Sequence, residues 1–160
     1  MDLLRSLLFV PGNRKDMLEK DINLQSDALV ADMEDSVPDS ENSNARQVIG
    51  EMLPSLGLNG HKIVVRVNAL DTGILQEDMQ TAVTEYTYAV NVGKVENKWD
   101  VDQVDAIMTK IEASKGIDVG KVKLILFIES AMAIINAYEL CSASSRIVAV
   151  AFGAEDYTVD

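Results

Sequence analysis

The sequence is poor in the residues that carry zinc, disulfide or thiol chemistry. It has one cysteine, Cys141, and one histidine, His61, in 160 residues. A single cysteine excludes an internal disulfide, and its place at the end of an amphipathic stretch predicts a packed, inert thiol. His61 follows a turn and has no partner at metal or triad spacing, so we expect a surface residue and no zinc site.

Long apolar runs and positive charge are also scarce. No run reaches the roughly 18 apolar residues of a membrane-spanning helix, and no small-residue cleavage site follows the apolar stretch Ser6–Val10. We therefore expect a cytoplasmic protein with no signal peptide and no membrane association. Lysine and arginine number 14 against 26 aspartate and glutamate residues, a net charge of −12 that disfavours nucleic-acid binding.

Short apolar runs alternate with longer amphipathic stretches along the chain. The runs, predicted as strands, are Ser6–Val10, Ala28–Met33, Lys62–Val67, Tyr88–Val92, Lys123–Ile128 and Arg146–Phe152. The amphipathic stretches, predicted as helices, are Asn13–Asp21, Ser43–Leu53, Ile74–Thr84, Val101–Ser114 and Ala131–Cys141. Pro54 is expected to help end the second helix. The alternation predicts a single α/β domain over residues 1–160, with a parallel sheet and right-handed crossovers.

Two architectures fit this order, a doubly wound open sheet and a (β/α)8 barrel of the TIM type. No Gly-x-Gly-x-x-Gly fingerprint follows the first run, which weakens a nucleotide-binding open sheet. Polar and charged residues gather at the C-terminal ends of the runs, where a barrel carries its chemistry. A whole barrel takes about 250 residues, so the chain is expected to supply an incomplete barrel of about six β/α units.

The ends of the last two runs suit a metal ion. Glu129 and Asp156 follow neighbouring predicted strands, and two carboxylates plus waters are typical of a Mg²⁺ site. Arg66 lies one residue before the end of the third run, and its two-pronged guanidinium suits a substrate carboxylate. Taken singly, an acid at a strand end, such as Glu129 or Asp156, is more often a helix cap or a salt-bridge partner. The convergence of several charged groups on one edge favours a functional site.

Six motifs in register carry a family resemblance. They are Arg5-Ser-Leu-Leu-Phe-Val-Pro-Gly-Asn-Arg14, Asp32-Met-Glu-Asp-Ser-Val37, Val65-Arg-Val-Asn68, Lys94-Val-Glu96, Ile128-Glu-Ser-Ala131 and Phe152-Gly-Ala-Glu-Asp156. With these motifs the chain resembles the HpcH/HpaI aldolase and citrate lyase β-subunit superfamily, which includes citryl-CoA, malyl-CoA and citramalyl-CoA lyases. The resemblance runs from Arg5 to Asp156, nearly the whole chain.

The resemblance implies roles for particular residues. It implies that Glu129 and Asp156 bind Mg²⁺, that Arg66 grips the keto-acid, and that Glu34 and Asp35 line the site and orient Arg66 or a metal-bound water. The remaining implied contacts are the backbone of Gly153, Ala154, Glu155 and Asp156 for the substrate carboxylate, and Phe9, Arg14 and Lys15 for the CoA-like arm.

The implied activity is a Mg²⁺-dependent carbon–carbon cleavage. A citryl, malyl or citramalyl thioester, on CoA or an acyl carrier, gives an acyl thioester and a keto-acid such as oxaloacetate, glyoxylate or pyruvate. Three departures stand out. Gly93 replaces the usual proline and is expected to loosen its strand end, while Met132-Ala133 replaces a usual glycine and is expected to crowd a helix start. Family members also continue for about two more strands, which carry an aspartate for a neighbouring subunit's site.

Two other functions stay open. A catalytically inactive, truncated barrel would act as a ligand-binding or subunit-assembly module. Both this module and the lyase predict a homo-oligomer, or assembly with other lyase subunits, because an incomplete barrel leaves sheet edges unpaired. A flavodoxin-like open sheet without chemistry would instead bind no Mg²⁺ at Glu129 and Asp156.

Overall fold

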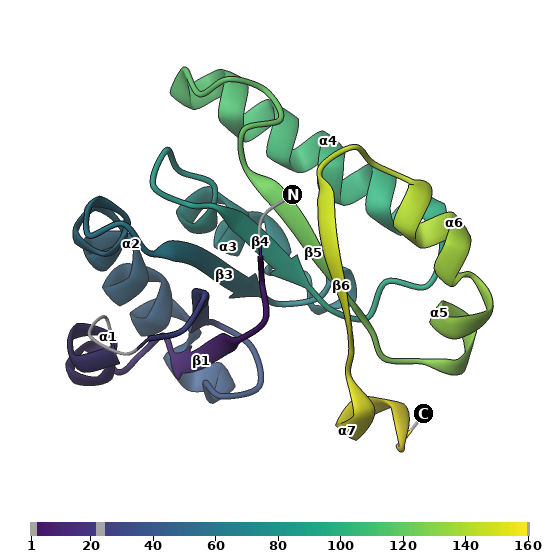
Figure 1. Cartoon of the computed structure of the whole chain (residues 1–160), viewed down its shortest axis with the longest axis horizontal. Coiled ribbons are helices and arrows are strands. Elements are labelled where there is room, and N and C mark those ends of the chain that lie inside the picture. Colours follow the sequence, from purple (N-terminus) through teal and green to yellow (C-terminus); the bar gives the residue numbers. More distant parts are fainter. Residues whose placement is uncertain (1–2, 22–24, 160) are drawn as a thin grey trace.

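The computed structural model describes residues 3–21 and 25–159 and contains one six-stranded sheet (Figure 1). The strands are β1 (Leu7–Pro11), β2 (Ala28–Asp32), β3 (Lys62–Val67), β4 (Ala89–Val92), β5 (Lys123–Ile128) and β6 (Ile147–Phe152). All neighbours are parallel and the spatial order is the chain order, β1 to β6. A doubly wound or flavodoxin-like sheet reverses its order at a switch point, so those alternatives are wrong and the barrel-type α/β prediction is confirmed.

Helices follow the strands and cover the outer side of the sheet (Figure 1). They are α1 (Lys15–Asp21), α2 (Asn42–Leu58), α3 (Leu75–Ala82), α4 (Lys98–Lys115), α5 (Ala131–Ile135), α6 (Ala137–Ser142) and α7 (Ala154–Tyr157), with 3₁₀ turns η1 (Asp39–Glu41) and η2 (Leu70–Thr72). Within the described ranges, no helix has both the length and the apolar character needed to cross a membrane.

The sheet is buried on both faces at its centre. On the outer side, large residues such as Leu29, Leu124 and Met108 pack between strands and helices with no exposed surface or almost none. On the inner side, a smaller cluster gathers Ala28, Val30, Val64, Ala89 and Ile125. Two buried faces explain why the strands appear in the sequence as continuous apolar runs. These runs match the strands to within one residue at each end.

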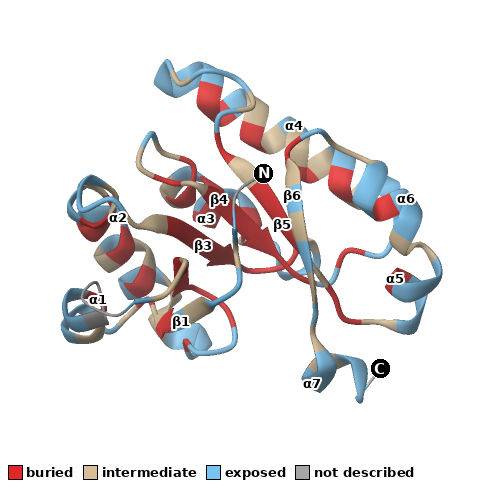
Figure 2. Ribbon diagram, in the orientation of Figure 1, coloured by how far each residue is buried: buried red, intermediate tan, exposed pale blue. Residues whose placement is uncertain are grey.

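The two outermost strands are less covered. Among the described residues, β1 pairs only with β2 and β6 only with β5. Figure 2 shows β3 to β5 largely buried, whereas β6 is intermediate and exposed. Along β6, Val148, Val150 and Phe152 are 36%, 45% and 57% exposed. The sheet therefore has two open edges, one of them lined with apolar side chains.

Helix α2 corrects one prediction, because it runs through Pro54 to Leu58. The proline lacks the N–H that would bond the carbonyl of Gly50, one turn earlier. Gly50 is exposed, so water can satisfy that carbonyl. Beyond the proline, Leu56 is fully buried and the Ser55 hydroxyl donates to the Met52 carbonyl at 2.8 Å. Burial of the last turn thus outweighs one missing hydrogen bond.

The predicted helix Ala131–Cys141 is two helices, α5 and α6, which meet at Asn136. The Asn136 side chain donates to the Glu96 carbonyl at 2.8 Å, which ties the junction to the loop after β4. Cys141 is exposed rather than packed, because α6 turns Leu140 into the core and its neighbour outward. Met132 is half exposed and Ser130 caps α5 through the N–H of Ala133, so the expected crowding of this helix start is wrong.

Candidate functional site

The charged residues at the C-terminal edge of the sheet come from five consecutive strands. Asp32 ends β2, Arg66 lies near the end of β3, and Lys94 follows β4. Glu129 follows β5 directly, and Asp156 lies in α7, just after β6. Because all strands run parallel, these residues meet at one edge, as the sequence pattern predicts.

Arg66 is the organising cation of this edge. Its Nε and Nη2 donate to the two carboxylate oxygens of Asp32 at 2.7 and 2.6 Å, a two-pronged pair between buried groups. Nη1 lies 2.9 Å from Asp35 and 3.3 Å from Glu34. The prong that was expected to grip a substrate carboxylate therefore holds Asp32. Arg66 lines the larger cavity together with Asp32 and Asp35.

Asp32 is held as a carboxylate by its partners. Burial opposes its charge, yet hydrogen bonds from Arg66 and Ser36 outweigh that effect and keep its pKa below the usual value. It also accepts the Glu34 N–H at 2.9 Å. Asp32 thus fixes both the arginine and the loop after β2. Sequence reasoning quoted this aspartate in a motif but gave it no role.

Glu34 is buried beside other negative charges. Its carboxylate lies 3.3 Å from Nη1 of Arg66 and 3.6 Å from Nζ of Lys94. Burial is the largest cause that raises its pKa to about 7, and the charges of Asp35 and Glu129 add to it. Glu34 is therefore a carboxyl that can exchange a proton near neutral pH.

Glu129 is wedged between two glycines. A Cβ added at Gly153 would lie 2.4 Å from Cγ of Glu129, and one added at Gly93 would lie 2.5 Å from Oε2. The Lys94 N–H donates to Oε2 at 3.1 Å. Burial and the charge of Asp156 raise the pKa of Glu129. Gly93 therefore makes room for a buried carboxylate, and the loosened strand end that was expected here is not observed.

Lys94 has an uncommon backbone conformation. Among the described residues it is the only non-glycine with a positive φ, at 55°. Residues other than glycine seldom adopt this left-handed backbone conformation, and those that do concentrate at functional sites. Here the conformation directs the N–H of Lys94 to Glu129 and its side chain toward Glu34.

Two adjoining cavities open at this edge. The larger encloses about 660 Å³ and is lined by Phe9, Asp32, Asp35, Ser36, Arg66, Phe127, Glu155 and Asp156. The smaller, of about 310 Å³, is lined by Lys94, Glu96, Glu129, Ser130, Asp156 and Val159. Asp156 lines both, and the two carboxylates expected to bind a metal, Glu129 and Asp156, share the smaller cavity. The rings of Phe9 and Phe127, 6.0 Å apart, form an apolar wall of the larger cavity.

Not every predicted site residue reaches these cavities. The predicted residues that line them are Phe9, Asp35, Arg66, Glu129, Glu155 and Asp156. Glu34 lines neither cavity, although its carboxylate lies 3.3 Å from Nη1 of Arg66. Arg14 is exposed and pairs with Asp16 at 3.0 Å, while Lys15 lies 4.0 Å from Glu51 on α2. Neither lines the two cavities. The N–H of Gly153 donates to the Ile128 carbonyl at 3.0 Å and is already used. The contacts expected for the Gly153–Asp156 backbone stay predictions.

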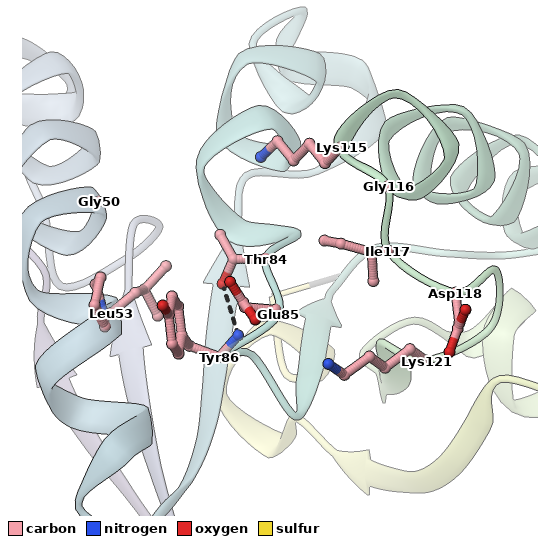
Figure 3. A pocket seen from close by; sticks show the side chains of 11 residues that line it. Gly50, Leu53, Thr84, Glu85, Tyr86, Lys115, Gly116, Ile117, Asp118 and Lys121 are labelled. Carbon is pink, nitrogen blue, oxygen red and sulfur yellow. Dashed lines mark hydrogen bonds between the residues drawn. The ribbon is translucent and has the colours of Figure 1, made fainter.

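A further cavity lies at the opposite edge of the sheet, between the C-terminal half of α2 and the loops that precede β4 and β5 (Figure 3). Its Lys115 is engaged, donating to the Val83 carbonyl at 2.9 Å. The remaining charged residues of its lining, Glu85, Asp118 and Lys121, are exposed. This cavity lacks the buried, mutually perturbed groups of the C-terminal edge, and we assign the chemistry to the latter.

Comparison with solved structures shows which proteins share this fold. The citrate lyase β subunit of M. tuberculosis complexed with oxaloacetate and magnesium superposes with a TM-score of 0.76 at 23% identity, over 99% of this chain and 63% of that one. A Haloferax volcanii malate synthase superposes with a TM-score of 0.87 at 21% identity, over 99% and 52%. The chain thus shares the fold of these two proteins.

Sequence similarity is closer. Citrate lyase subunit beta of Leuconostoc mesenteroides is 33% identical over 99% of this chain and 52% of its own length. The L-malyl-CoA/beta-methylmalyl-CoA lyase of Rhodobacter capsulatus is 34% identical over 97% and 49%. The profile of the HpcH/HpaI aldolase/citrate lyase family matches residues 5–160, and the chain belongs to that family. It spans about half the length of these curated relatives.

Proposed function

We propose that this chain carries the metal- and keto-acid-binding half of a Mg²⁺-dependent carbon–carbon lyase. The substrate class is a citryl- or malyl-type acyl thioester, cleaved to an acyl thioester and a keto-acid. The observation that carries the proposal is Glu129, buried between two glycines and facing the same cavity as Asp156. The relatives named citrate lyase subunit beta and malyl-CoA lyase support the reaction class.

The residues present fit a magnesium ion. Carboxylates outnumber cations at this edge, and burial and mutual repulsion raise the pKa values of Glu34 and Glu129, so a divalent cation would relieve the excess charge. Within the described ranges, no three acidic, histidine or cysteine side chains are grouped to hold a metal by themselves. Two carboxylates with waters and substrate are what Mg²⁺ usually takes. When bound, the ion would polarise a keto or thioester oxygen as a Lewis acid.

The protein's own groups supply orientation and a proton. Arg66, fixed by Asp32, lines the larger cavity, and its guanidinium would suit one oxygen of a substrate carboxylate. Glu34, with a pKa of about 7, can hold or release a proton on its carboxyl beside that guanidinium. Phe9 and Phe127 would exclude water from the thioester side. Arg14 and Lys15 would meet the CoA or carrier arm from outside the cavities.

We also propose that the chain works as an oligomer. The open edges at β1 and β6, with exposed Val148, Val150 and Phe152, are surfaces that a partner chain would cover. Relatives are about twice as long, so a partner or a further segment would complete the working site. A ligand-binding module without turnover is the second candidate. It is favoured by the same open edges and differs only in catalysis.

The test is Mg²⁺-dependent cleavage of citryl-CoA, malyl-CoA and citramalyl-CoA, with the variant Glu129→Ala and the control Glu139→Ala, an exposed position on α6. We expect at least one thioester to be cleaved by the parent chain and the control, and not by Glu129→Ala. Binding of Mg²⁺ with oxaloacetate but no cleavage would favour the module. Cleavage that survives in Glu129→Ala would contradict the assignment of the site.

A further inference from the structure

We propose that the ammonium of Lys94 is the counter-ion of the carboxylates in the metal-free site, and that a divalent cation displaces it on binding. The inference rests on the metal site proposed above and adds its regulation. Lys94 would stabilise the crowded carboxylates of the metal-free site and would set how tightly a cation binds there.

The first observation is where the ammonium lies. Nζ of Lys94 is 3.6 Å from Oε1 of Glu34, and the side chain lines the same cavity as Glu129 and Asp156. The Lys94 side chain therefore brings a positive charge into the region where we place Mg²⁺.

The second observation is how the backbone holds it. With φ at 55°, Lys94 turns its N–H to Oε2 of Glu129 while its side chain extends toward Glu34. One residue therefore contacts two carboxylates through two different groups. The N–H contact keeps Glu129 in position whether or not the ammonium stays.

The third observation is that the ammonium can leave. The Lys94 side chain is 45% exposed, whereas that of Glu34 is 7% exposed. Lys94 also lines a separate cavity, whose acidic residues would receive its ammonium. The other lining residues of that cavity are Leu70, Asp71, Glu96, Asn97 and Asp100. Arg66 has no such freedom, because its side chain is only 10% exposed and Asp32 holds two of its nitrogens.

Titration of MgCl2 by calorimetry at constant ionic strength tests the competition. In Lys94→Met the dissociation constant for Mg²⁺ should fall on the order of tenfold, because a repulsive charge next to the ion is gone. Lys94→Arg, which keeps the charge, should stay within about twofold. Lys98→Met is the matched control. It removes a similarly exposed lysine, paired with Asp102 at 2.6 Å on α4, and should also stay within about twofold.

A second measurement follows Lys94 itself in the parent sequence, and a variant serves only to assign its signal. Lysines are reductively methylated with ¹³C-formaldehyde, and the Lys94 signal is assigned by its loss in Lys94→Arg. On addition of Mg²⁺, this signal should move toward the position of freely solvated lysines.

The outcomes separate this inference from the proposed function. Mg²⁺ binding that is equal or weaker in Lys94→Met, together with an unmoved Lys94 signal, would overturn the counter-ion role and leave the metal site standing. No Mg²⁺ binding by either the parent or Lys94→Met would overturn both. Tighter binding in Lys94→Met but not in Lys98→Met supports both.

Discussion

Two largely buried arginines lie at opposite ends of the strands of the sheet, and they differ in how the surrounding carboxylates are hydrogen-bonded. Arg146 lies just before β6, at the N-terminal edge, and Arg66 lies near the end of β3, at the C-terminal edge. Both contact more than one carboxylate. The difference is in the pKa values of the acids around them.

Around Arg146 every charge is satisfied. Its Nε donates to Asp105 at 2.6 Å, and its two terminal nitrogens donate to Glu112 at 3.0 and 2.7 Å. The same nitrogens reach the Thr109 hydroxyl and the Val122 carbonyl. Burial opposes the charge of Glu112, yet hydrogen bonds from Arg146 and from backbone N–H groups keep its pKa below the usual value. This network fastens α4 to the starts of β5 and β6.

Around Arg66 the acids exceed the cations. Asp32 is satisfied, but burial leaves Glu34 and Glu129 with raised pKa values. A closed network stabilises the fold, whereas an excess of buried carboxylate is destabilising unless a proton, a lysine or a metal ion joins it. Acids outnumber cations in both clusters, so the comparison teaches that hydrogen bonding to the buried carboxylates, more than burial alone, separates the scaffold from the site.

The largest expected effect comes from opening the closed network. Glu112→Gln should lower the free energy of unfolding by about 3 kcal/mol, because Arg146 would keep a buried charge without its main partner. Urea unfolding measures this, with Glu139→Gln on exposed α6 as the control, expected to be unchanged. A loss below about 0.5 kcal/mol would mean that the network behaves like a surface pair.

The next effect concerns Glu129. Gly153→Ala places a methyl 2.4 Å from Cγ of Glu129, so the side chain of Glu129 must shift from its present position. We expect the Mg²⁺ dissociation constant to rise by roughly tenfold or more, by analogy with losses of metal-orienting contacts. Gly50→Ala is the matched control, because its Cβ would meet only Thr81 at 3.6 Å. Unchanged binding in Gly153→Ala would show that this glycine does not position Glu129.

A smaller effect concerns pH. The pKa of Glu34 is about 7 in the fold, above the usual 4.5 of an unfolded chain, so the folded state binds more protons between these values. Stability should therefore fall as pH rises from about 5 to about 8. Glu34→Gln should flatten this slope in metal-free buffer. Urea unfolding at several pH values checks it, and an identical slope in both proteins would contradict the raised pKa.

The smallest effect is expected at an exposed arginine. Arg14 is exposed and pairs with Asp16 at 3.0 Å, so Arg14→Ala should leave the thermal midpoint unchanged. Its role, if it meets the thioester arm, would appear as CoA binding weakened by about threefold. Equal CoA binding by the parent and the variant would remove Arg14 from the site.

The sequence predicts the sheet better than the site. The strand boundaries follow from runs that are apolar on both faces, and the placement of Glu129 and Asp156 follows from parallel strand ends. Local signals fail where tertiary contacts decide, as at Pro54 inside α2 and at the break beside Asn136. In each case burial or a distant hydrogen bond overrides local propensity.

The detailed site depends on contacts between residues far apart in the chain. Asp32 and Arg66 are paired across 34 positions, and no spacing rule indicates that the arginine's prong is occupied. The left-handed backbone conformation of Lys94 could not be predicted either, because lysine seldom has a positive φ. Gly93 shows the same limit, since only the fold reveals the carboxylate packed against it.

The most direct test of the central claim is a crystal of the chain soaked in Mn²⁺ and measured for anomalous scattering. Mn²⁺ takes the same oxygen ligands as Mg²⁺. The account predicts one strong peak between Glu129 and Asp156, with the Lys94 side chain moved away from Glu34, and no peak near Arg146. A peak elsewhere, or none at that edge while Mn²⁺ is bound in solution, would contradict it.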